Sequence, residues 1–213
     1  MRISHRYKFV FISKPRCAST TVRKALDPFS DIVSCQQHPY HHHTTAEKLC
    51  RHFREMNWNW DDYHKFVTIR NPWTMLISLY NFGLPDRNGK YFWQRYIEEI
   101  REKGYAEDQG NPPGDMIDFS DWLFEYDFSL YTLSHYAESQ DGRMLVDTVL
   151  TYENLENELP LLTGRLGFQI GPLPHLCSTH PVADVKDFYG NTERRRVEEL
   201  FHRDIERGRY RLL

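Results

Sequence analysis

A buried strand runs straight into a helix near the start of the chain, with a strongly polar turn between them. Lys8–Ser13 is β-branched and aromatic, as is typical of a buried strand, and Ser19–Leu26 has a helical pattern. The turn carries the cations Lys14 and Arg16, and hydroxyl side chains open the helix. Unpaired N–H groups and the dipole at a helix start favour an anion. This first junction (residues 13–21) predicts a site for one tetrahedral anion, with a hydroxyl-capped helix and exposed cations as the alternative.

A second strand–helix junction (residues 69–72) repeats the pattern. Lys65–Arg70 predicts a strand that ends on a cation, and the next stretch, up to Phe82, predicts a helix with Pro72 at its first position. An arginine fork suits a phosphate group, and Ser78 lies two turns into this helix. Two such junctions in one parallel sheet predict a ligand with two separated anionic groups.

The rest of the chain alternates strand and helix patterns. A third strand is predicted within Val146–Asn154, and a loop that could act as a lid at Gly104–Gly114. Further helices are predicted within residues 44–56, 91–103, 118–128, 130–139 and 155–167, and one long terminal helix at 191–208. The alternation predicts an α/β fold of three layers, a parallel sheet flanked by helices, in a single domain over residues 1–213.

Composition restricts the partners. The net charge of −3 argues against a general nucleic-acid-binding surface, so any basic site is local. No apolar run approaches a membrane span, and the first residues lack the pattern of a signal peptide, so no membrane partner is expected. The four cysteines form no C-x-x-C pair, which favours free thiols and a cytoplasmic location. The oligomeric state is left open.

Together, the two junctions resemble those of the sulfotransferases that use 3′-phosphoadenosine 5′-phosphosulfate (PAPS), especially the carbohydrate-type branch. The run "KPRCASTTVRKAL" is similar to the family's 5′-phosphosulfate loop, usually Pro-Lys-x-x-Gly-Thr-Ser. The run "FVTIRNPWTMLISLY" is similar to its 3′-phosphate motif, usually Arg-Asn-Pro-x-x-Arg-x-x-Ser-x-Tyr. "TYENL" and the terminal "DFYGN…LFHRDIERGRYRL" extend the resemblance from Phe9 to Tyr210. It implies a sheet like that of the phosphate-loop NTPases, although the signature G-x-x-x-x-G-K-[ST] is absent.

The resemblance implies PAPS as the donor, 3′-phosphoadenosine 5′-phosphate (PAP) as the product, and no metal. Arg70 and Ser78 would hold the 3′-phosphate, and the first junction the 5′-phosphosulfate, through Lys14, Arg16, Cys17, Ala18, Ser19, Thr20 and Thr21. Three positions depart from the family pattern. Arg16 stands where the family usually has its catalytic lysine, with Lys14 two residues earlier, so either cation could assist the leaving group. Ser19 replaces the usual glycine, and Met75 replaces the second arginine.

A base for the acceptor hydroxyl is expected in the histidine-rich stretch 38–43. Histidine titrates near neutral pH, and family members often carry one just before a helix start of this type, which implies His43, with His41 next. An ordinary imidazole pKa predicts that activity falls below about pH 6. The alternatives are exposed histidines with no role and a metal site, which lacks a partner motif in the sequence.

Two other functions are compatible with the sequence. One is a non-catalytic nucleotide-binding module of the same fold, and another is a phosphate-loop kinase. The acceptor is expected to be a carbohydrate or a small molecule. Tyr152 and Glu153, at the end of the third strand, predict a role near the acceptor or the adenosine, or simple packing. The tryptophans, including Trp73, predict either an acceptor platform or core.

Overall fold

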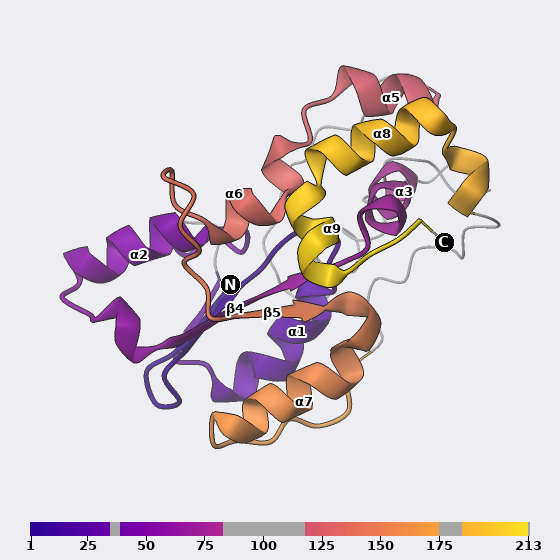
Figure 1. Cartoon of the computed structure of the whole chain (residues 1–213). Helices are drawn as coiled ribbons and strands as arrows, with labels where there is room; N and C mark the ends of the chain where they lie inside the picture. The colour runs from indigo at the N-terminus through magenta and orange to yellow at the C-terminus, as the bar shows by residue number, and fades with distance from the viewer. Residues whose placement is uncertain (35–38, 83–117, 175–184, 213) are drawn as a thin grey trace.

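The computed structural model describes residues 1–34, 39–82, 118–174 and 185–212, and its centre is a five-stranded sheet (Figure 1). The strand order is β3-β1-β2-β4-β5. The strands are β1 (Arg2–Ser4), β2 (Phe9–Ile12), β3 (Ile32–Val33), β4 (His64–Ile69) and β5 (Thr148–Thr151). β4 pairs in parallel with both β2 and β5, whereas β1 is antiparallel to β2 and to β3.

The three predicted strands are confirmed, but the expectation of a wholly parallel sheet is wrong at one side. β1 and β3 have three and two residues, too few to show a period of two in the sequence. The tight turn that joins β1 to β2 contains Lys8, which has a positive φ of 52°, and it folds β2 back onto β1. The coarse α/β prediction therefore holds, and the finer likeness to phosphate-loop proteins stays a prediction.

Helices cover both faces of the sheet (Figure 1). Successive residues of a strand point to opposite faces, so Phe9 and Phe11 pack with α1 (Ser19–Leu26) and α7 (Leu155–Arg165). Val10 and Ile12 pack on the other side, with α2 (Ala46–Glu55) and α6 (Leu133–Ala137). The structure thus has the predicted three layers. The start of α2 is capped by Thr45, whose hydroxyl accepts from the Lys48 N–H.

A second group of helices packs against the carboxyl side of β2 and β4. It contains α3 (Pro72–Phe82), α5 (Phe119–Glu125), α8 (Asn191–Leu200) and α9 (His202–Gly208), around a separate apolar cluster. The single terminal helix predicted over 191–208 is wrong, because the chain breaks at Phe201, which has φ −113° and ψ 23°. The Phe201 ring is fully buried, so the break lets both α8 and α9 face this cluster.

Short 3₁₀ turns connect several of these elements, at Asp27–Phe29, Trp60–Asp62, Ser129–Tyr131, Tyr152–Asn154 and Val185–Phe188. Within the described ranges, no helix has both the length and the apolar character to cross a membrane. Cys17 and Cys50 are free and buried. The predicted helix at 91–103 and the loop at 104–114 lie outside the described residues.

Candidate active site

The structure brings the two junctions into direct contact. β2 and β4 are parallel neighbours, with Ile12 opposite Val67, so both strands end at the same edge. The Arg16 guanidinium donates from Nη2 to the Ser78 hydroxyl at 2.7 Å. The Arg70 Nη1 reaches the Arg16 carbonyl at 3.5 Å. Arg16, Arg70 and Ser78, which the sequence assigned to two separate anion sites, therefore lie together at this edge; we call their meeting point the shared surface, and within it Ser78 is buried and the two arginines are half-buried.

The first junction has a backbone suited to an anion. Arg16 and Ala18 both have φ of 57°, the left-handed region that non-glycine residues rarely adopt, and such strain is concentrated at functional sites. The Thr68 hydroxyl fixes the loop by donating to the Cys17 carbonyl at 2.7 Å. No side chain caps α1, whose N-cap is Ala18, and the first turn of this helix contains no acidic residue. The helix dipole is therefore not compensated within this turn.

Two of the hydroxyl groups of α1 form hydrogen bonds within the protein. Thr20 accepts a hydrogen bond from Arg23 at 3.1 Å, and Thr21 donates to the Pro174 carbonyl at 3.1 Å. Ser19 is buried at the first position of the helix. The side chain of Cys17 is fully buried, so this residue can offer an anion only its backbone.

Arg70 lies half-buried with its charge uncompensated by any acidic partner among the described residues. Its Nε donates to the Thr74 hydroxyl at 3.2 Å, and its guanidinium lies 4.5 Å from the centre of the Tyr152 ring. Tyr152 is 42% exposed, so one face of this pair is open to solvent. A guanidinium held by neutral groups retains its full charge for an anionic ligand.

Glu153 supports the second junction rather than contacting Arg70. Its carboxylate accepts from the Asn71 N–H at 2.9 Å and from the Tyr210 hydroxyl at 2.8 Å. The Asn71 side chain caps α3 at the Trp73 N–H and donates to the Arg211 carbonyl. The end of the chain is thereby attached to the start of α3, a contact across about 140 residues that the local sequence pattern did not indicate.

Lys14, the alternative cation of the first junction, lies in the core. Its side chain is fully buried, and its Nζ forms an ion pair with the fully buried Asp204 of α9 at 3.0 Å. Burial alone would lower the pKa of Lys14, but Asp204 and the Cys17 thiol outweigh it and raise the pKa. The second Asp204 oxygen accepts from the Leu133 N–H at 2.7 Å. Lys14 therefore connects the loop to α6 and α9, and Arg16 is the cation that reaches the shared surface.

The Lys14 amine also lies 3.4 Å from the sulfur of Met75, the position where the resembling motif has its second arginine. An arginine at position 75 would place a second cation beside Lys14 in a closed space. Sequence reasoning missed Asp204, although one signal was present. It lies between Phe201 and Ile205 on the apolar side of the terminal segment, and a carboxylate at such a position requires a buried partner.

Replacing Lys14 with methionine is expected to lower the free energy of unfolding by about 3–5 kcal/mol, because Asp204 then stays buried without its partner. The double variant Lys14→Met/Asp204→Asn removes both charges and keeps an acceptor for the Leu133 N–H, so it should recover much of that loss. Urea unfolding of the two variants measures the difference. Equal stability of wild type and Lys14→Met would show that the ion pair does not hold the loop.

His43 is attached to the first junction by a hydrogen bond that fixes its protonation. Its Nδ1 lies 2.7 Å from the Ser13 carbonyl, and a carbonyl can only accept. In the neutral ring Nδ1 therefore carries the proton and Nε2 the lone pair. Burial, partly offset by the Ser13 carbonyl, lowers the His43 pKa to about 3. The ordinary imidazole pKa expected from the sequence is wrong for His43, because its environment disfavours the charged ring, so protonation of His43 no longer predicts a fall in activity below about pH 6.

His41 and His42 lie beside His43 in different environments. His41 accepts from the His43 N–H through Nδ1 at 3.3 Å, and its ring stacks 4.2 Å from that of His42. Burial, with the neighbouring charge of His43 next, lowers the pKa of His42 to about 2. Within the described ranges, no three histidine, cysteine, aspartate or glutamate side chains are arranged so that they could hold a metal ion together. His42 and His43 are thus neutral imidazoles at ordinary pH, and His38 lies outside the described ranges.

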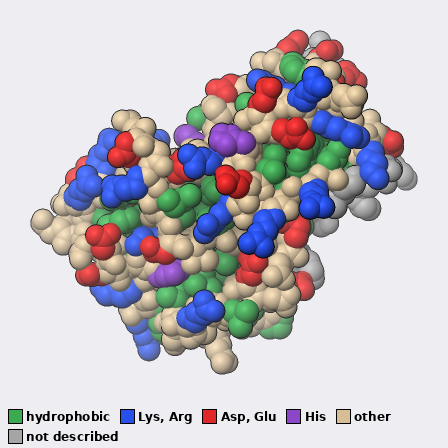
Figure 2. Space-filling view, in the orientation of Figure 1, with side chains coloured by type: hydrophobic (Ala, Val, Ile, Leu, Met, Phe, Trp, Pro, Cys, Tyr) green, Lys and Arg blue, Asp and Glu red, His purple; other side chains and the backbone are tan. Residues whose placement is uncertain are grey.

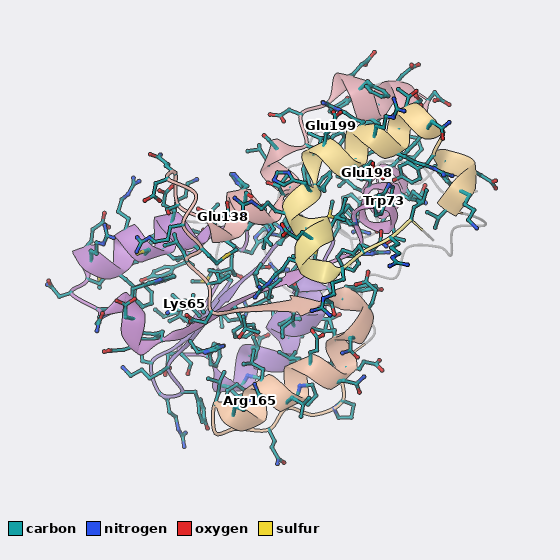
Figure 3. All side chains as sticks on the ribbon, viewed as in Figure 1. Lys65, Trp73, Glu138, Arg165, Glu198 and Glu199 are labelled. Atoms are coloured by element: carbon teal, nitrogen blue, oxygen red, sulfur yellow. The ribbon has the colours of Figure 1, made fainter. Side chains whose placement is uncertain are left out.

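The tryptophans that the structure describes belong mostly to the core. Trp73, labelled on α3 in Figure 3, is 2% exposed, and its carbonyl accepts from the Tyr189 hydroxyl at 2.7 Å. Trp60 is buried and Trp58 packs at the edge of the cluster around α2. The aromatic rings of Tyr152 and Phe82 border the shared surface instead, since Tyr152 lies against Arg70 and the Phe82 ring centre lies 4.8 Å from the Arg16 guanidinium.

Most of the chain matches a known protein family. Residues 1–170 match the model described as the sulfotransferase family, a span that includes both junctions and the histidine cluster. Asp204 and Tyr210 lie beyond the matched span. No curated protein matches the chain, and no solved structure matches it.

Proposed function

Because this chain belongs to the sulfotransferase family and is a PAPS-dependent sulfotransferase, we propose that it moves the sulfuryl group of PAPS to an acceptor hydroxyl on a carbohydrate or small molecule. The observation that carries the proposal is the meeting of the two junctions through Arg16, Ser78 and Arg70. PAPS has a 5′-phosphosulfate and a 3′-phosphate, and two adjoining cationic sites at one sheet edge suit such a pair of groups.

In this proposal the first junction binds the 5′-phosphosulfate. The first N–H groups of α1 and the hydroxyls of Ser19, Thr20 and Thr21 donate to its oxygens, and Arg16 neutralises its charge. Arg70 and Ser78 bind the 3′-phosphate at the second junction. The Tyr152 ring, which already supports Arg70 from one side, keeps that guanidinium oriented while the ligand enters.

The chemistry is an in-line displacement at sulfur. A new bond forms between the acceptor oxygen and sulfur as the bond between sulfur and the bridging phosphate oxygen breaks, and PAP leaves with the electron pair. Arg16 stabilises the negative charge that develops on the leaving phosphate. The Nε2 atom of His43 accepts the proton of the acceptor hydroxyl; burial opposes the charged ring that results and lowers the His43 pKa, and the Ser13 carbonyl, which accepts from Nδ1–H, offsets part of that cost. None of these steps uses a metal.

His43 has the geometry for this role because its Nδ1–H is bound to the residue that opens the first junction. The same contact places the imidazole beside the loop that holds the reacting group. His41, which accepts from the His43 N–H, fixes the backbone of His43 and is the second candidate. A cytoplasmic location, a fold of the phosphate-loop type, and the absence of nucleic-acid and membrane partners belong to the same proposal.

A thermal shift measurement with PAP, ATP and buffer tests the proposal against a kinase of similar fold. PAP at about 100 times its dissociation constant should stabilise the protein by about 2.7 kcal/mol, and ATP by much less, because it lacks a 3′-phosphate. Stabilisation by ATP alone would favour the kinase. Stabilisation by PAP without transfer of labelled sulfate to any acceptor tested would favour the non-catalytic binding module.

A further inference from the structure

A cavity of about 280 Å³ lies away from the two junctions, between α2 and the tight turn at residues 138–145. The turn is closed by a bridge between Glu138 and Met144 and by the Leu145 N–H, which donates to the Ala137 carbonyl at 2.7 Å. Glu138, labelled in Figure 3, marks the start of this turn beside α6. The volume is slightly below the range of typical small-molecule sites, which begins at about 300 Å³, so only a compact ligand would fit.

Three arginines line this cavity from two separate elements: Arg51 and Arg54 come from α2, and Arg143 comes from the turn. Figure 2 shows Lys and Arg side chains gathered at the left of the molecule, where α2 lies. In the part of the chain that the structure describes, no hydrogen bond or ion pair involves these three guanidinium groups. All three arginines are exposed, so solvent screens part of their mutual repulsion, and a bound anion would relieve the remainder.

The two acidic residues of the cavity have structural partners of their own. Glu47 accepts from the Gln140 N–H at 3.2 Å, which attaches the turn to α2. Asp141 accepts from the Ser139 hydroxyl within the turn, and this hydrogen bond lowers the pKa of Asp141, so its carboxylate is ionised. With three guanidinium groups and two carboxylates, the lining keeps an excess positive charge.

The position of the arginines has one local explanation. Cations near the end of a helix interact favourably with its dipole, which accounts for Arg54 in the last turn of α2. That effect does not account for Arg143, which belongs to another element and faces the same cavity; the charge of Arg143 is, however, one of the smaller causes of the low pKa of Asp141 in its own turn. The convergence of guanidinium groups from two elements is what a site for an oxyanion requires, because each fork can donate two hydrogen bonds.

We propose that this cavity binds a compact polyanion, a small molecule with at least two carboxylate, sulfate or phosphate groups. The site is distinct from the donor site, since Arg51 and Arg54 lie about 8–12 Å along α2 from its first residue, Ala46, at 1.5 Å per residue. His43 and the first junction lie at the opposite end of that helix. The proposal rests on the cavity and its charges and does not require the donor assignment.

Calorimetry with pyrophosphate tests the site, using the full chain at constant ionic strength with PAP present to fill the donor site. The wild type is expected to bind one pyrophosphate saturably. The variant Arg51→Gln/Arg54→Gln should bind it at least about tenfold more weakly, because two charged hydrogen-bond donors are lost. The matched control Arg165→Gln/Arg195→Gln removes two exposed arginines from α7 and α8 and should bind as wild type. Figure 3 labels Arg165 on α7, away from the cavity.

Two results would overturn the proposal: no saturable binding to the wild type, or equal weakening in both double variants. Circular dichroism in chloride buffer checks that the variants fold. If Arg51→Gln/Arg54→Gln does not fold, the single variant Arg143→Gln gives an independent measurement of pyrophosphate binding. In the same titration without PAP, Arg70→Ala should still bind pyrophosphate at this cavity, and that result separates the cavity from the donor site. If PAP fails to bind anywhere, the proposed function fails, while pyrophosphate binding that depends on Arg51 and Arg54 still stands.

Discussion

Replacing His43 with alanine is expected to lower turnover by about 10²-fold or more while donor affinity changes little. The imidazole accepts a proton only as the acceptor attacks, so its loss affects the chemical step, and general-base catalysis contributes about this much. Turnover under saturating donor, together with calorimetry of PAP, measures the two effects separately. His42→Ala is the matched control, because His42 is the neighbouring imidazole and has no assigned role. Full activity in His43→Ala would exclude this residue as the base.

The pH dependence provides a second readout of the same residue. With a pKa of about 3, His43 stays neutral at ordinary pH, so its protonation should not lower turnover until the solution is strongly acidic. In the unfolded chain this imidazole has its usual pKa of 6.5 and binds a proton more readily. Its contribution to the free energy of unfolding therefore decreases as the pH falls below 6.5. Added chelator should leave activity unchanged, and a loss of activity would favour a metal at the histidine cluster.

Replacing Arg16 with alanine is expected to lower turnover by about 10²-fold, more than it weakens donor binding. A cation beside the leaving phosphate stabilises charge that develops mainly in the transition state, and removal of one such group costs about 10²–10³ in rate. Steady-state kinetics with PAPS varied at saturating acceptor separates turnover from donor affinity.

Arg16→Lys is the informative partner variant, because it places a lysine at the position where the resembling family carries one. It should retain more activity than Arg16→Ala if a point charge suffices, although a lysine cannot reproduce the guanidinium contact to Ser78. Lys14→Met is the opposing variant. If it abolishes turnover in a folded protein while Arg16→Ala is mild, Lys14 is the catalytic cation and the assignment of Arg16 is wrong.

The parts of the site that the sequence predicted are those carried by local pattern. Strand, turn and helix follow one another directly at each junction, so the sequence assigns Arg16 and Ser78 to the same edge of the sheet. In the structure these two side chains are hydrogen-bonded. The helix predicted within residues 44–56, which is present as α2 with Thr45 as its N-cap, follows from the same kind of local rule. These features depend on residues within a few positions of each other, and the structure agrees with them.

The parts that the sequence did not predict depend on distant contacts. Lys14 looked like a surface cation of the turn, and its burial follows from Asp204, about 190 residues later. The low His43 pKa follows from packing around the ring, which no motif reports. The helical pattern continues on both sides of Phe201, but the helix breaks there. Burial of the Phe201 ring stabilises the fold more than one uninterrupted helix would.

The donor site formed by the two junctions is tested most directly by calorimetry of PAP against adenosine 5′-phosphate, which lacks the 3′-phosphate. PAP is expected to bind the wild type more tightly by about 2–3 kcal/mol, the contribution of one charged hydrogen-bonded contact, and Arg70→Ala should remove most of that difference. Such a result would place the 3′-phosphate at Arg70. Equal binding of the two nucleotides to the wild type would contradict a donor site that spans both junctions.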